Sequence, residues 1–147
     1  MPRIIGVDYG KRRIGIAVSD SDADIAFPLE TIEISGVKAA ARRIAVLCEE
    51  QGVSEIVVGL PLNMNGSEGQ MAAEARTFGE RLNQRGNCPV HMWDERLTTA
   101  GIEKTLIEAD VSRRKRRQVR DKLAAQQILQ GYLDARKLSS RTPPEER

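Results

Sequence analysis

Residues 3–18, RIIGVDYGKRRIGIAV, contain two short apolar runs that are separated by a glycine turn. The runs at 3–8 and 13–18 predict two strands joined tightly, and Gly10 can supply the positive φ that such a turn needs. Asp8 ends the first strand, and a carboxylate at the end of a buried strand is costly to desolvate unless something pairs with it. A metal ion is the partner we favour, and a metal bound there points to phosphate chemistry.

The rest of the chain shows alternating strand and helix patterns. Further strands are predicted over Phe27–Ile34, Glu55–Gly59 and Pro89–Trp93. A first helix is predicted over 37–51, and Gly52 is placed to end it. A second helix carries Met71, Ala75, Phe78 and Leu82 on one side. Two more helices are predicted over Thr99–Ala109 and over 118–136. Ser67 and Gln70 have capping-box spacing before the second helix. The order predicts an α/β fold, a five-stranded mixed sheet covered by helices.

Composition is consistent with one aliphatic domain. A chain of 147 residues is most simply a single domain, and with 3% aromatic residues its core must be built from aliphatic side chains. We expect this domain to span 1–136, and the polar residues 137–147 to form a disordered tail. Cys48 and Cys88 have neither metal-type nor redox-type spacing, so we expect two reduced, buried thiols. With no membrane-length apolar run and no signal peptide, we expect a cytoplasmic protein that does not bind membranes.

Basic residues are concentrated late in the chain. The net charge of +2 says little about partners. The basic block consists of Arg113, Arg114, Lys115, Arg116, Arg117, Arg120 and Lys122. Such a run is commonly a solvated segment, and the alternative is a surface that contacts nucleic-acid phosphates.

Two acidic positions follow predicted strands. Strand alternation places Asp8 on the same face as Ile4 and Gly6. The alternative to a metal ligand is a turn aspartate that hydrogen-bonds its own backbone. Asp94 and Glu95 follow the last strand, where α/β sheets tend to place their sites. Alternation sends the two to opposite sides, so that only one joins a shared site. The alternative is a solvated loop in which Glu95 pairs with an arginine.

A third acid, Asp121, lies in the last predicted helix. At about 100° per residue it aligns with Ala125, Ile128 and Tyr132, and so it begins an apolar stripe. The alternatives are compensation of the helix N-terminal charge or a pair with Arg117. Acids from three separate elements would supply the hard oxygen ligands of a divalent-metal site. Two ions ~4 Å apart could activate a water and stabilise the leaving oxygen of a phosphodiester.

The polar loop 59–69 is a weaker candidate site. Asn63, Asn65 and Ser67 offer hydrogen bonds, and the loop leads into a helix N-terminus, which favours phosphate. A plain connecting loop is the alternative. His91, the only histidine, lies in the middle of a predicted strand and is expected to be structural, which disfavours histidine-based catalysis; Trp93 is expected to pack.

Four motifs in order resemble the YqgF family of Holliday junction resolvases and pre-16S rRNA nucleases, which have an RNase H-like fold. They are Gly6–Gly10 with Arg13–Asp20, Val58–Gly66, Asp94–Thr99 and Asp121–Ala125, and the likeness runs from residue 4 to about 136. The resemblance implies that Asp8, Glu95 and Asp121 are the catalytic, metal-binding acids, with Mg²⁺ or Mn²⁺ as cofactor. Asn65 departs from the acid that many relatives have there.

The resemblance predicts a metal-dependent nuclease, most simply one that processes the 5′ end of pre-16S rRNA. Asp8 would bridge two ions, Arg113–Arg117 would hold phosphates, and Asn63 and Asn65 would also contact nucleic acid. One alternative is a resolvase of branched DNA, which needs a dimer. Others are a non-catalytic RNA-binding factor of ribosome assembly and an actin-type ATPase, for which the chain is short. We expect structured RNA or branched DNA as partner, and a monomer or homodimer.

Overall fold

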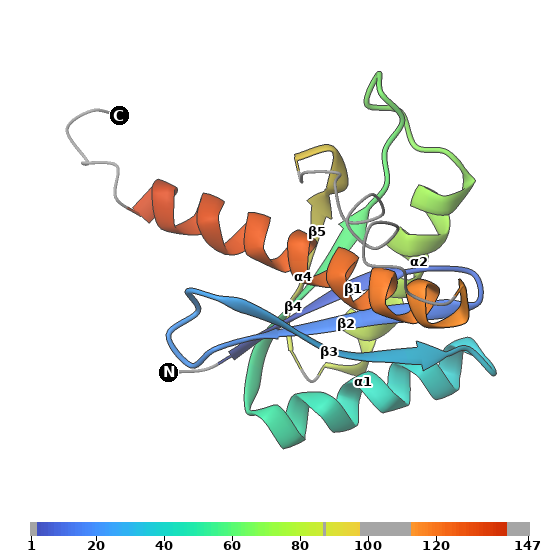
Figure 1. Ribbon diagram of the computed structural model, residues 1–147. Coiled ribbons are helices and arrows are strands. Elements are labelled where there is room, and N and C mark those ends of the chain that lie inside the picture. The colour runs from blue at the N-terminus through green and yellow to red at the C-terminus, as the bar shows by residue number, and fades with distance from the viewer. Residues whose placement is uncertain (1–2, 87, 98–112, 141–147) are drawn as a thin grey trace.

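Five strands form one mixed sheet in the computed structural model, which describes residues 3–86, 88–97 and 113–140 (Figure 1). The strands are β1 (Arg3–Tyr9), β2 (Arg13–Ser19), β3 (Ala26–Glu33), β4 (Val53–Leu60) and β5 (Val90–Asp94). Their order across the sheet is β3-β2-β1-β4-β5. β1 pairs antiparallel with β2 and parallel with β4, and β5 is parallel to β4. The predicted five-stranded mixed sheet is confirmed.

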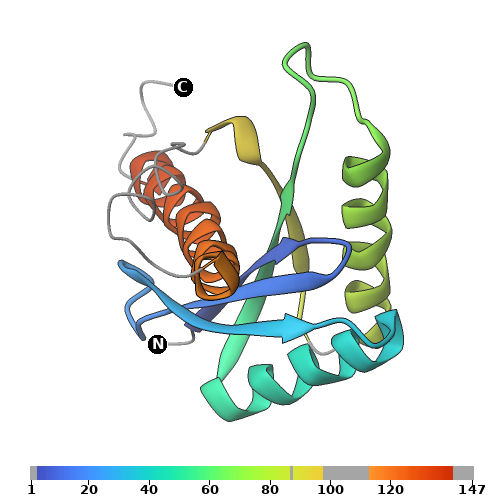
Figure 2. The same cartoon turned by 45° about the vertical axis from the view of Figure 1, so that its right-hand side comes forward.

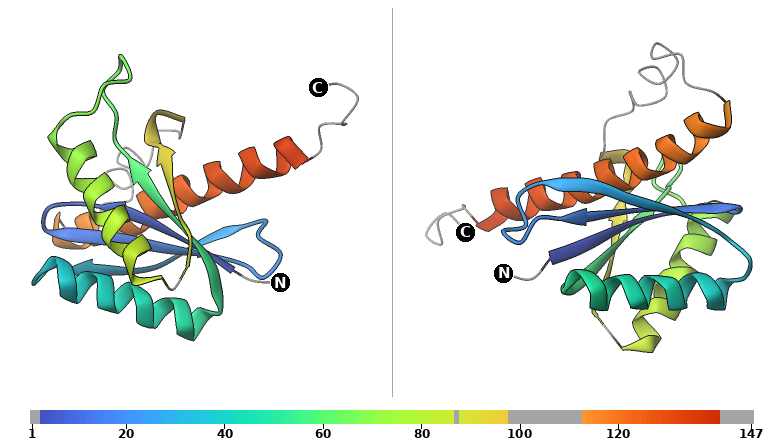
Figure 3. Two further views of the ribbon diagram at one scale, coloured as in Figure 1. Left: turned by 180° about the vertical axis from the view of Figure 1, so that it is seen from behind. Right: turned by 60° about the horizontal axis from the view of Figure 1, so that its bottom comes forward.

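Helices cover both faces of this sheet. They are α1 (Val37–Gln51), α2 (Gln70–Arg85), the short 3₁₀ helix η1 (Glu95–Leu97) and α4 (Arg113–Ser140). Figure 2 and the right-hand view of Figure 3 show α1 and α2 on one face and α4 alone across the other. None of the helices that the structure describes is both long and apolar enough to cross a bilayer. The helix predicted over Thr99–Ala109 lies outside the described residues.

Strand alternation divides the core into two apolar layers. Ile5 and Val7 of β1 are fully buried against α1 and α2, whereas Ile4 is buried on the α4 side. Among the side chains of α4 that the structure describes, those of Ala125, Ile128, Leu129 and Leu133 are buried. Each fully buried aliphatic side chain of this size contributes roughly 1.5–3 kcal/mol by leaving water, so α4 is held to the sheet by its apolar stripe.

Local signals predict some helix ends correctly and others wrongly. Gly52 ends α1 in the left-handed conformation, with φ of 64°, as predicted. The predicted capping box before α2 is wrong, because the helix begins after Gly69 without a side-chain cap. The hydroxyl of Ser67 instead donates a hydrogen bond to Oδ1 of Asn65. Gly10 does not adopt a positive φ, and its lack of a side chain serves close packing, since a Cβ there would lie 2.6 Å from the carbonyl oxygen of Arg13.

Helix α4 is longer at both ends than its apolar pattern predicts. It begins at Arg113, so the first basic residues belong to its opening turns, and it continues to Ser140, so 137–140 are helical and do not belong to a disordered tail. Lysine and arginine have high intrinsic helix propensity, which supports a helix without any apolar stripe. Residues 141–147 lie outside the described residues, so the prediction of a disordered tail there is not tested.

Candidate active site

Three parallel strands, β1, β4 and β5, end at the same edge of the sheet, and two of the predicted acids lie there. Asp8 is the last residue but one of β1, and Glu95 directly follows β5. As predicted, Asp8 lies on the sheet face covered by α4, the face of Ile4. The third acid, Asp121, is carried to this face by α4.

Gly15 makes the approach of Asp121 possible. In the β1–β2 ladder Gly15 lies directly opposite Asp8. A Cβ built on Gly15 would lie 1.9 Å from the backbone oxygen of Asp121, so no other residue fits beneath the helix at this point. The absent side chain therefore brings the backbone of α4 against the strand that pairs with Asp8.

Gly59 of β4 has the same effect for Glu95. A Cβ on Gly59 would lie 3.0 Å from Cγ of Glu95 and 2.5 Å from Cδ1 of Ile128 on α4. The Glu95 side chain thus lies over β4 and beneath α4. Its neighbour Asp94 instead accepts three hydrogen bonds from the Arg96 side chain at 2.7–3.1 Å. The prediction that one acid of this pair joins the site is consistent with this geometry.

The carboxylates of Glu95 and Asp121 lie close enough to Asp8 to influence its ionisation. Burial is the largest cause that raises the pKa of Asp8 to about 7, and the negative charges of Glu95 and then Asp121 raise it further. Arg120 opposes this rise in part. Burial also raises the pKa of Glu95, with the charge of Asp94 as the second cause. Carboxylates from three separate elements therefore influence one another at this edge of the sheet, and such a set of oxygen donors fits a bound cation.

Asp121 has an arginine partner in the sheet. Nε of Arg13 on β2 donates to Oδ2 of Asp121 at 2.8 Å, and both side chains are mostly buried. Asp121 is in the third turn of α4, too far from its start for the N-terminal charge role. The side chain of Arg117 is outside the described part, so the alternative pair with it is not tested.

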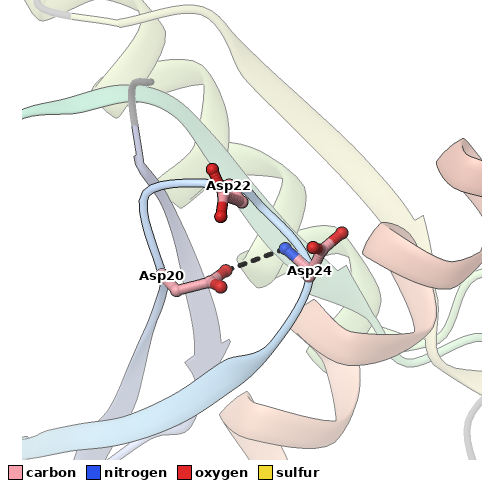
Figure 4. Close-up of side chains that lie close together, drawn as sticks. All are labelled: Asp20, Asp22 and Asp24. Atoms are coloured by element: carbon pink, nitrogen blue, oxygen red, sulfur yellow. Dashed lines mark hydrogen bonds between the residues drawn. The ribbon is translucent and has the colours of Figure 1, made fainter.

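A tighter group of acids lies at the other end of the sheet. Asp20, Asp22 and Asp24, in the loop between β2 and β3, have carboxylate oxygens within 4.8 Å of one another (Figure 4). Within the described residues Asp8, Glu95 and Asp121 form no group as tight as this. The loop is stabilised internally, since Asp20 accepts a hydrogen bond from the backbone N–H of Asp24 at 2.8 Å. The Asp-x-Asp-x-Asp spacing was the sequence signal for this cluster.

The loop after β4 is ordered by its own polar side chains. Asn63 Nδ2 donates to Ser67 Oγ at 2.9 Å, and Asn65 Oδ1 accepts from both the backbone N–H and the hydroxyl of Ser67. Arg96 donates to the backbone oxygen of Met64 at 3.1 Å, which ties the loop to η1. That Asn63 and Asn65 bind nucleic acid stays a prediction, as does the role of Arg113–Arg117, whose side chains are not described.

His91 and Trp93 take part in a structural cluster on β5. His91 Nε2 lies 3.2 Å from Glu55 Oε1, and its ring stacks on Tyr132 with centroids 5.9 Å apart. Trp93 contacts the same tyrosine edge-on, also at 5.9 Å. These contacts agree with the structural and packing roles predicted for both residues.

The sequence matches the RuvX family, described as Holliday junction resolvase, over residues 2–135. The chain belongs to the RuvX family. It is 44% identical over 140 residues to a protein of Desulforudis audaxviator, covering 95% of this chain and 99% of the relative. It is 51% identical over 134 residues to a protein of Pelotomaculum thermopropionicum, covering 90% and 87%. Both relatives are named "Putative pre-16S rRNA nuclease". RuvX is the YqgF family under another name, so the predicted family membership is confirmed.

Among solved structures, Thermus thermophilus RuvC in complex with a Holliday junction substrate is similar, with a TM-score of 0.58. The identity is 14%, with 93% of this chain and 96% of RuvC covered. At this identity the likeness shows the fold alone, and it confirms the RNase H-like architecture. The names of the RuvX family and of its relatives are those of nucleases, which act on phosphodiester bonds, so the predicted enzyme class is supported.

Proposed function

We propose that this member of the RuvX family is a metal-dependent nuclease that hydrolyses phosphodiester bonds of structured RNA, in the 5′-end processing of pre-16S rRNA. Two observations support the substrate and the chemistry. The relatives that share nearly half of its residues carry that name. The observation that carries the chemistry is geometric: the missing side chains of Gly15 and Gly59 let Asp121 and Glu95 approach the strand end that carries Asp8. Burial, and then the charges of these two acids, raise the pKa of Asp8.

The donor set fits a divalent ion of the Mg²⁺ or Mn²⁺ kind. Asp8, Glu95 and Asp121 offer hard carboxylate oxygens, which these ions prefer. When bound, such ions activate a water and stabilise the leaving oxygen. The contribution of the chain is to hold the three carboxylates on a strand, a post-strand turn and a helix that Gly15 and Gly59 bring together.

Substrate binding is assigned to the basic opening turns of α4 and to the loop after β4. Residues 113–117 bring five positive charges to the end of the helix that also carries Asp121. Phosphates of nucleic acid are the natural counterions of such a run, and a helix N-terminus favours them further. Asn63 and Asn65 lie on the exposed loop at the carboxyl edge of β4. The reaction would take place in the cytoplasm.

The test is a side-by-side cleavage assay on a pre-rRNA leader and a four-way DNA junction with Mg²⁺ or Mn²⁺. We expect the leader to be cut and cleavage to fall by a factor of about a hundred or more in Asp8→Asn, Glu95→Gln and Asp121→Asn. The matched control is Asp22→Asn, which removes an exposed carboxylate of the other acidic cluster. Equal cleavage by wild type and Asp8→Asn would refute the assigned site.

Junction resolution is the second candidate, and the description of the matching family favours it. Symmetric cutting of two strands requires a dimer. Faster cleavage of the junction than of the leader, together with a dimer in sedimentation with junction DNA, would select this function. A non-catalytic RNA-binding role is excluded if metal-dependent turnover is lost in Asp121→Asn while RNA binding survives.

A further inference from the structure

Arg13 is the first residue of β2 and lies at the edge of the sheet that carries the proposed active site. Gly15 is opposite Asp8 in the β1–β2 ladder, and strand alternation puts Arg13 on the same face as Gly15. On that face α4 brings Asp121 to Arg13, whose Nε donates to Oδ2 of Asp121 at 2.8 Å. Arg13 therefore holds a positive charge next to a proposed metal ligand, and the proposed chemistry does not yet use it.

The guanidinium of Arg13 is bonded to Asp121 through one nitrogen only. Within the described residues neither of its Nη groups donates a hydrogen bond. Two other arginines bind their carboxylates differently, since Arg43 and Arg96 each donate through both Nε and Nη2. The pair of Arg13 with Asp121 therefore leaves the forked pair of Nη groups, with all their N–H donors, available to another acceptor.

The unbonded Nη groups of Arg13 can be reached from outside the protein. The side chain is 21% exposed. In the part of the chain that the structure describes, the buried polar atoms without a partner belong to Glu74, Trp93 and Gln127, so the Nη atoms of Arg13 are in contact with solvent. Asp121 also has an oxygen to spare, because only its Oδ2 accepts a hydrogen bond from a described residue. Its Oδ1 stays available to a cation.

We propose that the Nη groups of Arg13 bind a phosphate of the nucleic-acid substrate that flanks the scissile one. The fork of N–H donors in arginine matches two oxygens of a phosphate, and a guanidinium that is already fixed at Nε loses less freedom on binding. Asp121 then orients Arg13 through Oδ2 and keeps Oδ1 for the cation. The assignment rests on the proposed nuclease function.

Two observations favour a flanking phosphate. Of the described basic side chains, Arg120 and not Arg13 lowers the pKa of Asp8, so the guanidinium of Arg13 lies further from the acid at the centre of the site. The chain next to Arg13 is also basic, since the exposed Lys11 and Arg12 precede it in the turn before β2. Such a surface attracts a phosphodiester backbone that runs past the metal-binding acids.

The test changes the protein and the substrate together. Each phosphate beside the mapped cleavage position of the leader RNA is replaced in turn by an uncharged methylphosphonate, and cleavage by the full-length protein is measured. For wild type we expect a flanking position at which neutralisation lowers kcat/KM about tenfold. In Arg13→Gln and Arg13→Lys the same neutralisation should change kcat/KM by less than about twofold. The matched control is Arg43→Gln, which removes the arginine of another ion pair and should keep the wild-type effect.

Arg13→Lys separates this contact from a structural role. The single ammonium of lysine can keep the pair with Asp121, but it lacks a second group for the phosphate, so the melting temperature should stay close to that of wild type. A tenfold loss that persists in either Arg13 variant, or a wild-type protein indifferent to every flanking methylphosphonate, would overturn the proposal.

If wild-type protein cuts no RNA, the proposed function fails, and the contact of Arg13 is tested by binding alone. The probe is a single-stranded RNA oligonucleotide, added without metal to protein labelled at its arginine side chains. A shift of the Arg13 Nε–H resonance in NMR spectra, lost when the phosphates of the probe are replaced by methylphosphonates, supports the contact. No shift, or an equal shift with the uncharged probe, contradicts it.

Discussion

Arg13 on β2 and Asp121 on α4 are 108 positions apart in the sequence, yet Nε of the arginine donates to Oδ2 of the aspartate over 2.8 Å. The pair joins the sheet to the helix directly above Gly15. It also provides a fixed positive charge at one of the three proposed ligands. A divalent cation at Asp121 must therefore share the carboxylate with this guanidinium.

Replacing Arg13 should change the affinity for metal. In Arg13→Gln we expect Mn²⁺ to bind several-fold more tightly, because the competing positive charge is gone, as measured by isothermal titration calorimetry. The metal-free variant should lose about 1 kcal/mol of unfolding free energy, from the lost charge-assisted hydrogen bond. Arg12→Gln, at the exposed neighbouring position, should change neither quantity. Weaker Mn²⁺ binding in Arg13→Gln would mean that Arg13 aligns Asp121 for the ion.

The raised pKa of Asp8 predicts how stability without metal depends on pH. Since the folded pKa of about 7 exceeds the reference value of 3.8, protonation of Asp8 favours the folded state. This contribution is complete below 3.8 and is lost as the pH rises through about 7. In the presence of EDTA, Asp8→Asn should exceed wild type in unfolding free energy by roughly 1–3 kcal/mol at mildly alkaline pH, and by little near the reference value. Urea unfolding at several pH values measures this.

The control for that series is Asp22→Asn, which lies in the other acidic cluster. The difference in unfolding free energy between Asp22→Asn and wild type should not change with pH in the way expected for Asp8→Asn. If the difference in unfolding free energy between Asp8→Asn and wild type stays constant across the pH range, ionisation of Asp8 does not destabilise the folded state.

Adding a single methyl group at Gly15 should displace α4. The new Cβ would lie 1.9 Å from the backbone oxygen of Asp121, so the helix must shift outward in Gly15→Ala. We expect a loss of roughly 2–4 kcal/mol in unfolding free energy, typical of a severe overpacking clash, and impaired cleavage. Gly36→Ala is the comparison, because a Cβ there has no atom within 4 Å. Similar melting temperatures for the two variants would contradict the close approach.

Arg96 should keep the loop after β4 in place. Its guanidinium bonds both Asp94 and the backbone oxygen of Met64, and so it ties the loop to η1. In Arg96→Ala we expect faster amide hydrogen exchange over residues 61–69. Global stability should change by less than about 1 kcal/mol, since the pair with Asp94 is partly exposed to solvent. Leu97→Ala, an exposed neighbour, should leave the exchange of the loop unaltered. Unchanged exchange in Arg96→Ala would show that the loop orders itself through Asn63 and Ser67.

The basic turns of α4 should set the salt dependence of nucleic-acid binding. The variant replaces Arg113, Arg114, Lys115, Arg116 and Arg117 by glutamine. The slope of log K against log salt concentration should become shallower by roughly 2–4, because each lost phosphate contact removes about 0.9 for duplexes. A control with Arg81→Gln and Arg85→Gln on α2 should keep the wild-type slope. Equal slopes in all three proteins would remove α4 from the nucleic-acid interface.

Features that depend on neighbouring residues could be predicted from the sequence. The apolar run that ends at Asp8 predicts β1, and the stripe from Ala40 to Cys48 with Gly52 after it predicts α1 and its end. That only one of Asp94 and Glu95 joins the site also follows from alternation, because a strand sends successive side chains to opposite faces, whereas the choice of Glu95 came from the family resemblance.

Features that depend on distant packing could not be predicted in this way. The pair of Arg13 with Asp121 exists because α4 lies flat on β2, which no local pattern states. The early start of α4 was missed because its first turns bury no apolar stripe, and helix propensity alone extends it.

The contact between Gly15 and the backbone of Asp121 has a consequence for how relatives of this chain can diverge. Because a bare strand surface sets the height of the helix above the sheet, a relative that holds an acid at this place must also keep a glycine in the strand beneath it.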